Sequence, residues 1–226
     1  TEENAPHIYD CVISVVASNF LPSQSIIMST SSEIHHMHHL LQHLHLREQW
    51  NFIVSHPQNS SSELDNKNND YLINYIIILD IYKTKNEILL NLRKNIEQLQ
   101  RIASWNQTGR FIVVLINSVN VQNSKLSIKI ILDELWKNKV NDVVILIQVT
   151  HDIVDIYSWF PYELPSGMCG ILQEAVLLDS WNYHSTGGFF SQNKSLFHNK
   201  IPKIITGCPL RVSTAHFPPY VIFKLD

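Results

Sequence analysis

The sequence predicts an α/β fold: a layered, mostly parallel sheet flanked by helices, followed by an irregular C-terminal part. Short apolar runs of strand length alternate with segments whose apolar residues recur at helical spacing. Such alternation is typical of parallel strands joined by helical crossovers. The chain has 226 residues and is 45% hydrophobic, which is enough apolar material for one substantial core.

The N-terminal part predicts one strand and one helix. Residues 11–17 (CVISVVA) form a short β-branched run bounded by polar residues, which favours a buried strand that opens the sheet. A loop with Pro22 should follow. Thr30 and Glu33 have the spacing of a capping box, so we expect a helix from there to near Gln49.

Two further strands should lie on either side of a polar loop. Residues 50–55 (WNFIVS) predict a strand, and residues 71–80 (YLINYIIILD) form an almost continuous apolar run, as in strands covered on both faces. Residues 57–70 are nearly all polar and cannot bury enough apolar surface to offset their ordering entropy, so we expect an exposed loop. The capping box of Thr84 and Glu87 should start the next helix.

The central part continues the alternation. The helix that follows Thr84 should end before Gly109, and residues 111–117 and 142–148 predict strands. Apolar residues within 127–139 recur at helical spacing and predict an amphipathic helix between those strands. Residues 154–160 alternate in polarity, which indicates one more strand.

The last third should be less regular. Residues 161–208 hold five of the six glycines and several prolines, so we expect turns there, with a linker over residues 196–208. The tract 156–170 concentrates aromatic side chains beside proline. These rings either pack at a domain interface or cover one end of the sheet.

Composition argues against several classes of function. Only 16% of residues are charged and the net charge is -3, so we expect no nucleic-acid partner. Phosphate-binding glycine motifs and Cys-x-x-Cys pairs are absent from the sequence, and we expect no cofactor. No apolar run approaches the ~20 residues that a membrane-spanning helix needs. The sequence begins at Thr1 without a signal peptide, and we expect it to be an excerpt of a longer chain.

Two clusters of polar residues offer candidate chemistry. Six histidines lie in the helix expected after Thr30, at His35, His36, His38, His39, His43 and His45, and the first, fourth and fifth share one helical face. They either chelate zinc or copper or form a solvated, pH-sensitive face; we favour the solvated face and expect no metal. Asp152, Asp155 and Glu163 group in sequence without a histidine partner or nucleophile turn beside them, so we expect no enzyme.

Several segments resemble a known family. They are DVVILIQ (142–148), IVDIYSWFPYE (153–163), CG (169–170), LLDSW (177–181) and LFHNKIPKIITGCPLRVSTAHFPPYV (196–221). Together they resemble insect ionotropic receptors, which are variant relatives of ionotropic glutamate receptors. The last segment is the most specific, because it is similar to the phrase that joins the amino-terminal domain of such a receptor to the first strand of its ligand-binding domain.

The resemblance implies a domain organisation and a function. Residues 1–195 would form an extracellular amino-terminal domain with the fold of a periplasmic-binding-protein lobe, residues 196–208 a linker, and residues 209–226 the truncated start of a ligand-binding domain. The protein would be a subunit of a ligand-gated cation channel used in chemosensory detection, located in the cell membrane through segments that this chain lacks. This part would lie outside the cell, contribute to assembly with other receptor subunits as a hetero-oligomer, and meet a small-molecule ligand in the full receptor.

The resemblance also implies roles for single residues. Tyr220 matches a tyrosine that flanks the agonist in glutamate receptors, although Pro218 stands where those receptors have an acidic residue; alternatively, Tyr220 packs beneath the cleft. Because an extracellular chain is oxidised, we expect a disulfide between Cys169 and Cys208 with Cys11 left over, while the sequence leaves the other pairings open.

Glycosylation and two other functions complete the expectations. The sequons at Asn59, Asn106 and Asn193 lie in polar stretches and are candidate glycan sites. The first alternative function is a stand-alone soluble ligand-binding domain of periplasmic-binding type. The second is a hydrolase on an α/β scaffold, which would need a nucleophile and a base that converge at the strand ends.

Overall fold

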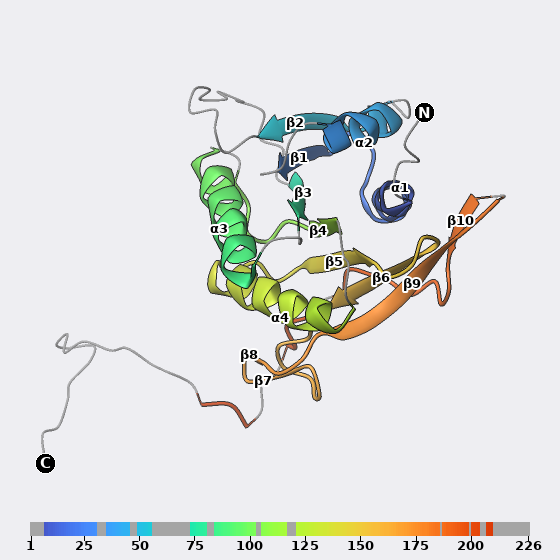
Figure 1. The fold of residues 1–226 in the computed structure, drawn as a ribbon. Coiled ribbons are helices and arrows are strands. Elements are labelled where there is room, and N and C mark those ends of the chain that lie inside the picture. The colour runs from blue at the N-terminus through green and yellow to red at the C-terminus, as the bar shows by residue number, and fades with distance from the viewer. Residues whose placement is uncertain are drawn as a thin grey trace, which may run out of the picture.

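A mixed sheet of eight strands runs through the computed structural model, in the order β10-β9-β6-β5-β4-β3-β1-β2 (Figure 1). The structure describes residues 7–30, 35–45, 49–55, 73–80, 84–102, 105–116, 121–185, 187–198, 200–203 and 207–209. The strands of this sheet are β1 (Ser25–Thr30), β2 (Asn51–Ser55), β3 (Ile73–Asp80), β4 (Phe111–Ile116), β5 (Val143–Gln148), β6 (Ile153–Ser158), β9 (Val176–His184) and β10 (Gly187–Phe190). This layered sheet confirms the α/β fold class.

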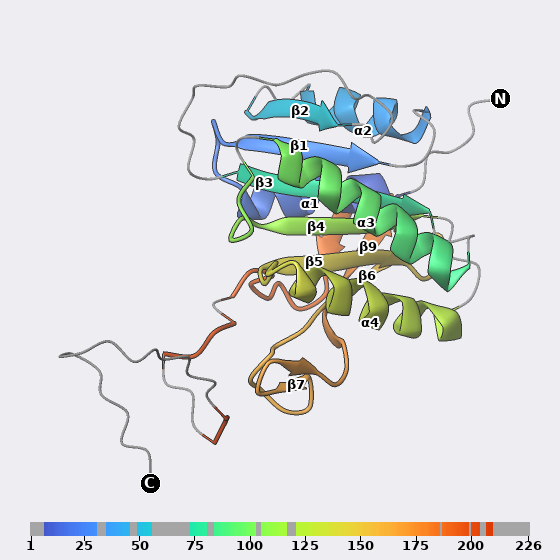
Figure 2. The same cartoon turned by 90° about the vertical axis from the view of Figure 1, so that its left-hand side faces the viewer.

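Two pairs of helices cover the sheet, one pair on each face (Figures 1 and 2). Helices α1 (Ile8–Asn19) and α2 (His35–His45) lie on one side, here called the α1 face, and α3 (Lys85–Arg101) and α4 (Val121–Lys137) lie on the other, the α3–α4 face. Strands β2, β1, β3, β4 and β5 pair in parallel, whereas β6, β9 and β10 add antiparallel pairs. The parallel part follows from the helical crossovers, which return the chain to the same end of the sheet.

The central strands bury side chains on both faces. In β4, Ile112 and Val114 belong to the core of the α1 face, while Val113 and Leu115 belong to the core of the α3–α4 face. All six residues of this strand are buried. Continuous apolar runs are therefore what the fold requires here, which explains why β3, β4 and β5 were predicted correctly to within two residues.

The α3–α4 face follows its sequence signals closely. Thr84 and Glu87 form the predicted capping box at the start of α3. Arg93 of α3 donates two hydrogen bonds to the Glu134 carboxylate of α4, at 2.7 and 3.0 Å. These bonds hold the pKa of Glu134 below its ordinary value. Strands β2 and β6 and helices α3 and α4 also confirm their predictions, with shifted ends.

The prediction of a strand over residues 11–17 was wrong. Residues 11–17 lie in α1, a helix, and β1 occupies residues that we expected to form a loop. The β-branched run is compatible with a helix because this helix is buried on most sides, so packing overrides strand propensity. The neglected signal is polar: Asp10, Ser14 and Ser18 recur every four residues along the exposed side of α1.

Three other expectations concern residues that the structure does not describe or domain boundaries that it does not test. Thr30 ends β1 and α2 begins at His35, while the capping partner Glu33 lies outside the described residues, as does the expected loop over residues 57–70. The domain boundaries after residues 195 and 208 stay predictions.

Among the described helices, none combines the length and the apolar character needed to cross a membrane.

Residues 161–208 are more regular than we expected, because β9 and β10 extend the sheet. The alternation in β9 is disturbed by a β-bulge: the register shifts between Ile156 and Tyr157 of β6, and both Leu178 and Asp179 are buried as a result. A strand with this shift lacks the period of two that would have predicted it.

A small two-stranded sheet and a disulfide follow β6. Strands β7 (Gly167–Met168) and β8 (Ile171–Leu172) form a hairpin, here called the β7–β8 hairpin, that projects below the main sheet in Figure 2. A disulfide joins Cys169 at its tip to Cys208, the pairing that the resemblance suggested. Cys11 is buried in α1 without a disulfide, and its burial raises the pKa of the thiol.

Candidate functional site

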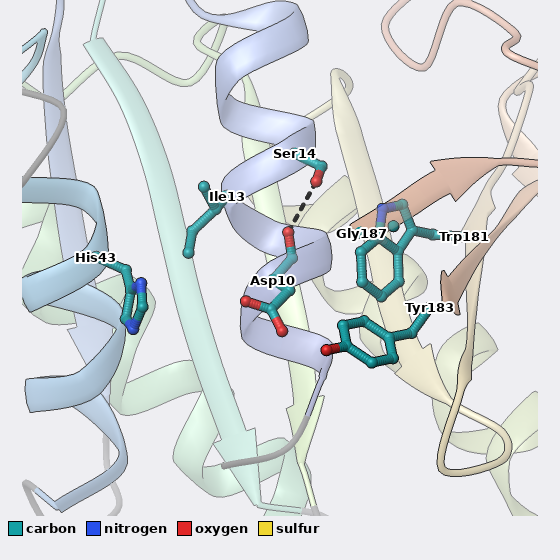
Figure 3. Close-up of a pocket in the computed structure, with 8 residues that line it drawn as sticks. Asp10, Ile13, Ser14, His43, Trp181, Tyr183 and Gly187 are labelled. Carbon is teal, nitrogen blue, oxygen red and sulfur yellow. Dashed lines mark hydrogen bonds between the residues drawn. The ribbon is translucent and has the colours of Figure 1, made fainter. Parts of the chain in front are cut away.

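A hollow of about 290 Å³ opens between α1, α2 and the hairpin of β9 and β10 (Figure 3). We call it the α1–β9 hollow. It is close in size to the smallest pockets that hold organic ligands, roughly 300 Å³. The residues that line it are Asp10, Ile13, Ser14, His43, Trp181, Tyr183, Gly187 and Gly188.

Helix α1 supplies an acidic and a hydroxyl group to the hollow. Asp10 and Ser14 are four residues apart and therefore share one side of the helix. Ser14 Oγ donates a hydrogen bond to the Asp10 carbonyl oxygen at 2.9 Å, drawn as a dashed line in Figure 3. The Asp10 side chain is 42% exposed, so its carboxylate is accessible to a ligand. Ile13 adds an apolar contact beside them.

Strand β9 supplies two aromatic walls. Trp181 and Tyr183 are two residues apart, so both project from the same face of the strand, and Figure 3 shows them opposite Asp10. Gly188 of β10 makes room for the indole, because a Cβ atom on this residue would lie 1.7 Å from Trp181 Cζ2. Only glycine therefore allows β10 to cross over the tryptophan ring.

His43 of α2 closes the hollow on the side away from Tyr183 (Figure 3). It belongs to the histidine-rich segment, which forms a helix as predicted. The side chains of His35 and His39 lie outside the described residues, so the choice between a metal site and a solvated face on this helix stays open.

The hollow suits a small molecule with a positive charge. The Asp10 carboxylate offers a charged hydrogen-bond acceptor. Trp181 and Tyr183 add aromatic lining, although Trp181 is only 1% exposed and one face of the Tyr183 ring is stacked on His7. Among the described side chains that line the hollow there is no lysine or arginine, and His43 is the only basic group.

A comparison with protein families places the chain among receptors. A family model described as "Putative ionotropic receptor, ligand binding domain" matches residues 26–203, well over half of the chain. The chain belongs to this family. No curated protein and no solved structure matches it. Ionotropic receptor ligand-binding domains form a receptor family rather than an enzyme family.

The residues predicted for the receptor site do not include those that line the hollow. Tyr220 lies outside the described residues, so its role beside an agonist is untested. Asp10, Trp181 and Tyr183 were missed by sequence reasoning. A signal for the last two was present, since two large aromatic residues at i and i+2 precede the glycine pair of a tight hairpin.

The predicted glycan sites of the receptor domain are only partly described. Asn59 lies outside the described residues. Asn106 Oδ1 accepts hydrogen bonds from the backbone N and Oγ1 of Thr108, at 2.9 and 2.7 Å. Asn193 is exposed and has a positive φ of 50°. Glycosylation at the three sequons stays a prediction.

Asp152, Asp155 and Trp159, which the sequence marked as candidates or as part of the aromatic tract, each contact a different residue. Ser180 Oγ donates to Asp155 Oδ1 at 2.7 Å, whereas Asp152 Oδ1 lies 2.9 Å from His151 Nδ1. The expectation that these carboxylates have no histidine partner was therefore wrong for Asp152, and the hydroxyl beside Asp155 is that of Ser180. Trp159 is fully buried and packs edge-on against Trp136 of α4, with ring centroids 5.0 Å apart. At this position the aromatic tract covers the sheet, one of the two roles expected for it.

Proposed function

We propose that the chain is the extracellular amino-terminal part of an insect-type ionotropic receptor subunit, a ligand-gated cation channel used in chemosensory detection. The family match supports a receptor role, and the family phrase over residues 196–221 supports the finer assignment. The Cys169–Cys208 disulfide is in keeping with an oxidising, extracellular location at the cell membrane.

The ligand we propose is a small organic ammonium ion bound in the α1–β9 hollow. The single observation that carries this proposal is the hollow itself, which the exposed Asp10 carboxylate and two aromatic residues line within a receptor ligand-binding family. An ammonium group would donate hydrogen bonds to Asp10, and its apolar part would lie against Trp181 and Ile13.

Three ligands of matched shape and different charge test this assignment. Calorimetry should detect binding of 2-phenylethylamine and no binding of 3-phenylpropionate, with the neutral 2-phenylethanol bound at least tenfold more weakly than the amine. The Asp10→Asn variant should lose at least tenfold in amine affinity, a loss typical of one charged hydrogen bond. Glu174→Gln removes one exposed negative charge elsewhere and should leave amine binding unchanged.

Two results would overturn the ligand assignment. The first is equal affinity for 3-phenylpropionate and 2-phenylethylamine, because the hollow would then not distinguish a negative from a positive ligand. The second is an unchanged amine affinity in Asp10→Asn while the variant keeps its melting temperature. Calorimetric stoichiometry below one ligand per chain would point to binding by a minor contaminant, and the assignment would fail in the same way.

The receptor role itself needs the complete protein. Expressed with candidate partner subunits, the full receptor should reach the cell surface and give currents that respond to amines, acids, temperature or humidity steps. Amine binding to this chain together with a full-length product that never conducts would favour the alternative, a stand-alone ligand-binding domain. Tyr220→Ala in the same recordings tests the predicted agonist contact.

For assembly, we propose that the β7–β8 hairpin contacts another receptor subunit. Leu164, Met168 and Ile171 are large, apolar and exposed there, and the disulfide holds the hairpin in place. Exposed apolar groups gathered on a rigid projection are typical of protein interfaces. Ile171→Asp should reduce co-precipitation of full-length subunits, whereas Leu90→Asp on the exposed side of α3 should not; equal recovery of both variants would contradict the interface.

A further inference from the structure

Three potential metal ligands meet where α1 begins. His7 is the N-cap residue of α1, and His151 and Asp152 lie in the turn between β5 and β6. One ligand atom from each of the three side chains lies within 4.8 Å of the other two. The fold thus brings together residues that are more than 140 positions apart in the sequence.

Contacts around His7 hold its imidazole in place. The ring stacks on Tyr183 with centroids 3.6 Å apart and an interplanar angle of 16°. It also meets the edge of the His151 ring, with centroids 4.7 Å apart. Only 16% of the His7 side chain is exposed. A ligand fixed in this way loses little conformational entropy when it binds a metal.

The other two ligands are held by their backbone, and their side chains contact each other, with His151 Nδ1 2.9 Å from Asp152 Oδ1. Tyr183 N donates to the Asp152 carbonyl oxygen at 2.7 Å, which ties the turn to β9. The side chains of His151 and Asp152 are 68% and 61% exposed. Rotation of these exposed groups shortens the separations toward the ~3.3 Å expected between ligand atoms when metal bonds are ~2.0–2.1 Å long.

A second carboxylate orients the buried histidine. His7 Nδ1 lies 3.4 Å from Asp10 Oδ2. A hydrogen bond there places the proton on Nδ1 and leaves Nε2 available as a ligand, the arrangement by which carboxylates support metal-bound histidines. Asp10 would act on the metal through His7 without being a ligand.

We propose that His7, His151 and Asp152 bind a divalent transition-metal ion of the zinc class. Two imidazole nitrogens and one carboxylate oxygen are a donor set that suits Zn²⁺, with water in the fourth position. Magnesium and calcium prefer oxygen ligands alone and are not expected to bind here. The site shares Asp10 and Tyr183 with the α1–β9 hollow, but its three ligands do not line that hollow.

Titration with Zn²⁺ tests the site in the chain as it stands. Calorimetry should give one strong site per chain, and Zn²⁺ should raise the melting temperature because it binds the folded state. Co²⁺ should give the visible absorption of a tetrahedral complex. The variants His151→Ala and Asp152→Asn should each weaken Zn²⁺ binding at least tenfold; both residues are exposed, so the fold should tolerate the changes.

Two controls separate this site from other histidines. His184→Ala removes an exposed histidine at the end of β9 and should leave Zn²⁺ binding unchanged. The double variant His35→Ala/His39→Ala removes two histidines of α2 and should also retain the strong site. Loss of the strong site in the α2 variant, or its persistence in His151→Ala, would overturn the proposal. Because no amine enters these titrations, their outcome is independent of the ligand assigned to the hollow.

Discussion

The two faces of the sheet are covered in different ways. On the α3–α4 face, α3 and α4 lay apolar side chains against the strands, and the charged pair of Arg93 and Glu134 lies at the rim between the helices. The buried polar groups Ser29 and Asn95 satisfy each other there at 2.6 Å. The α1 face instead keeps the hollow and the polar residues around it.

A buried carboxylate on β9 anchors the segment that follows β10. The segment after β10 packs Leu196 and Phe197 against the core of this face. Buried Asp179 accepts backbone hydrogen bonds from Gln192 and Lys194, at 2.9 and 3.2 Å, and so fixes the start of this segment. The comparison indicates that α3 and α4 mainly stabilise the fold through apolar contacts. On the α1 face, part of the apolar contact is replaced by polar groups that can recognise a ligand.

The largest expected effect on stability comes from creating a cavity in the core of the α3–α4 face. Leu132 of α4 is fully buried in the core of the α3–α4 face. Leu132→Ala should lower the free energy of unfolding by about 3 kcal/mol, because a sealed core leaves a cavity. Ile13→Ala, at the border of the hollow, should cost about half as much, since its side chain already adjoins open space. Urea unfolding measures both, and equal losses would show that the α1 face is packed as tightly as the other.

A smaller effect should follow from filling space at the hollow. Gly188→Ala places a Cβ atom against the Trp181 ring, which must shift, and we expect a loss of about 2 kcal/mol. The same variant should weaken binding of 2-phenylethylamine, because the displaced indole enters the hollow. Phe189→Ala, on an exposed neighbour, should change neither quantity much. Unchanged stability and binding in Gly188→Ala would mean that the ring is not confined by β10.

The difference between the faces also explains which elements could be predicted. On the α3–α4 face each local signal agrees with the packing: Thr84 caps α3, and β4 is apolar throughout. On the α1 face the local signals conflict with the packing. The β-branched residues of α1 favour a strand, and a helix forms because that segment packs against the sheet.

The candidate site was harder to predict than the fold. Asp10, Tyr183 and His151 come from α1, β9 and the turn after β5, so their proximity depends on the strand order of the sheet. Sequence spacing reports neighbours along one element only. Residues 11–17 were predicted to form a strand, and β9 was not predicted at all. Because α1 and β9 form two walls of the hollow, the hollow could not be predicted from the sequence.

The smallest expected effect is a pH dependence that comes from Lys200. Its side chain is 1% exposed and its ammonium group donates to the carbonyl oxygens of Asn141 and Val143 and to Ser158 Oγ, at 3.2, 2.9 and 2.5 Å. Burial lowers the pKa of Lys200 to about 8, and the Asp142 charge opposes this shift. The unfolded chain keeps the proton up to the ordinary pKa of 10.5.

Between these two pKa values the unfolded state binds more protons, so the contribution of Lys200 to stability rises with pH. The gain is at most about 1.4 kcal/mol per pH unit. Urea unfolding at pH 7.5, 8.5 and 9.5 should therefore show that the free energy of unfolding of wild type rises with pH relative to that of Lys200→Met. The difference in free energy between wild type and Lys203→Met, a variant of an exposed neighbour, should not change with pH. A constant difference between wild type and Lys200→Met would mean that Lys200 is as well solvated as a surface lysine.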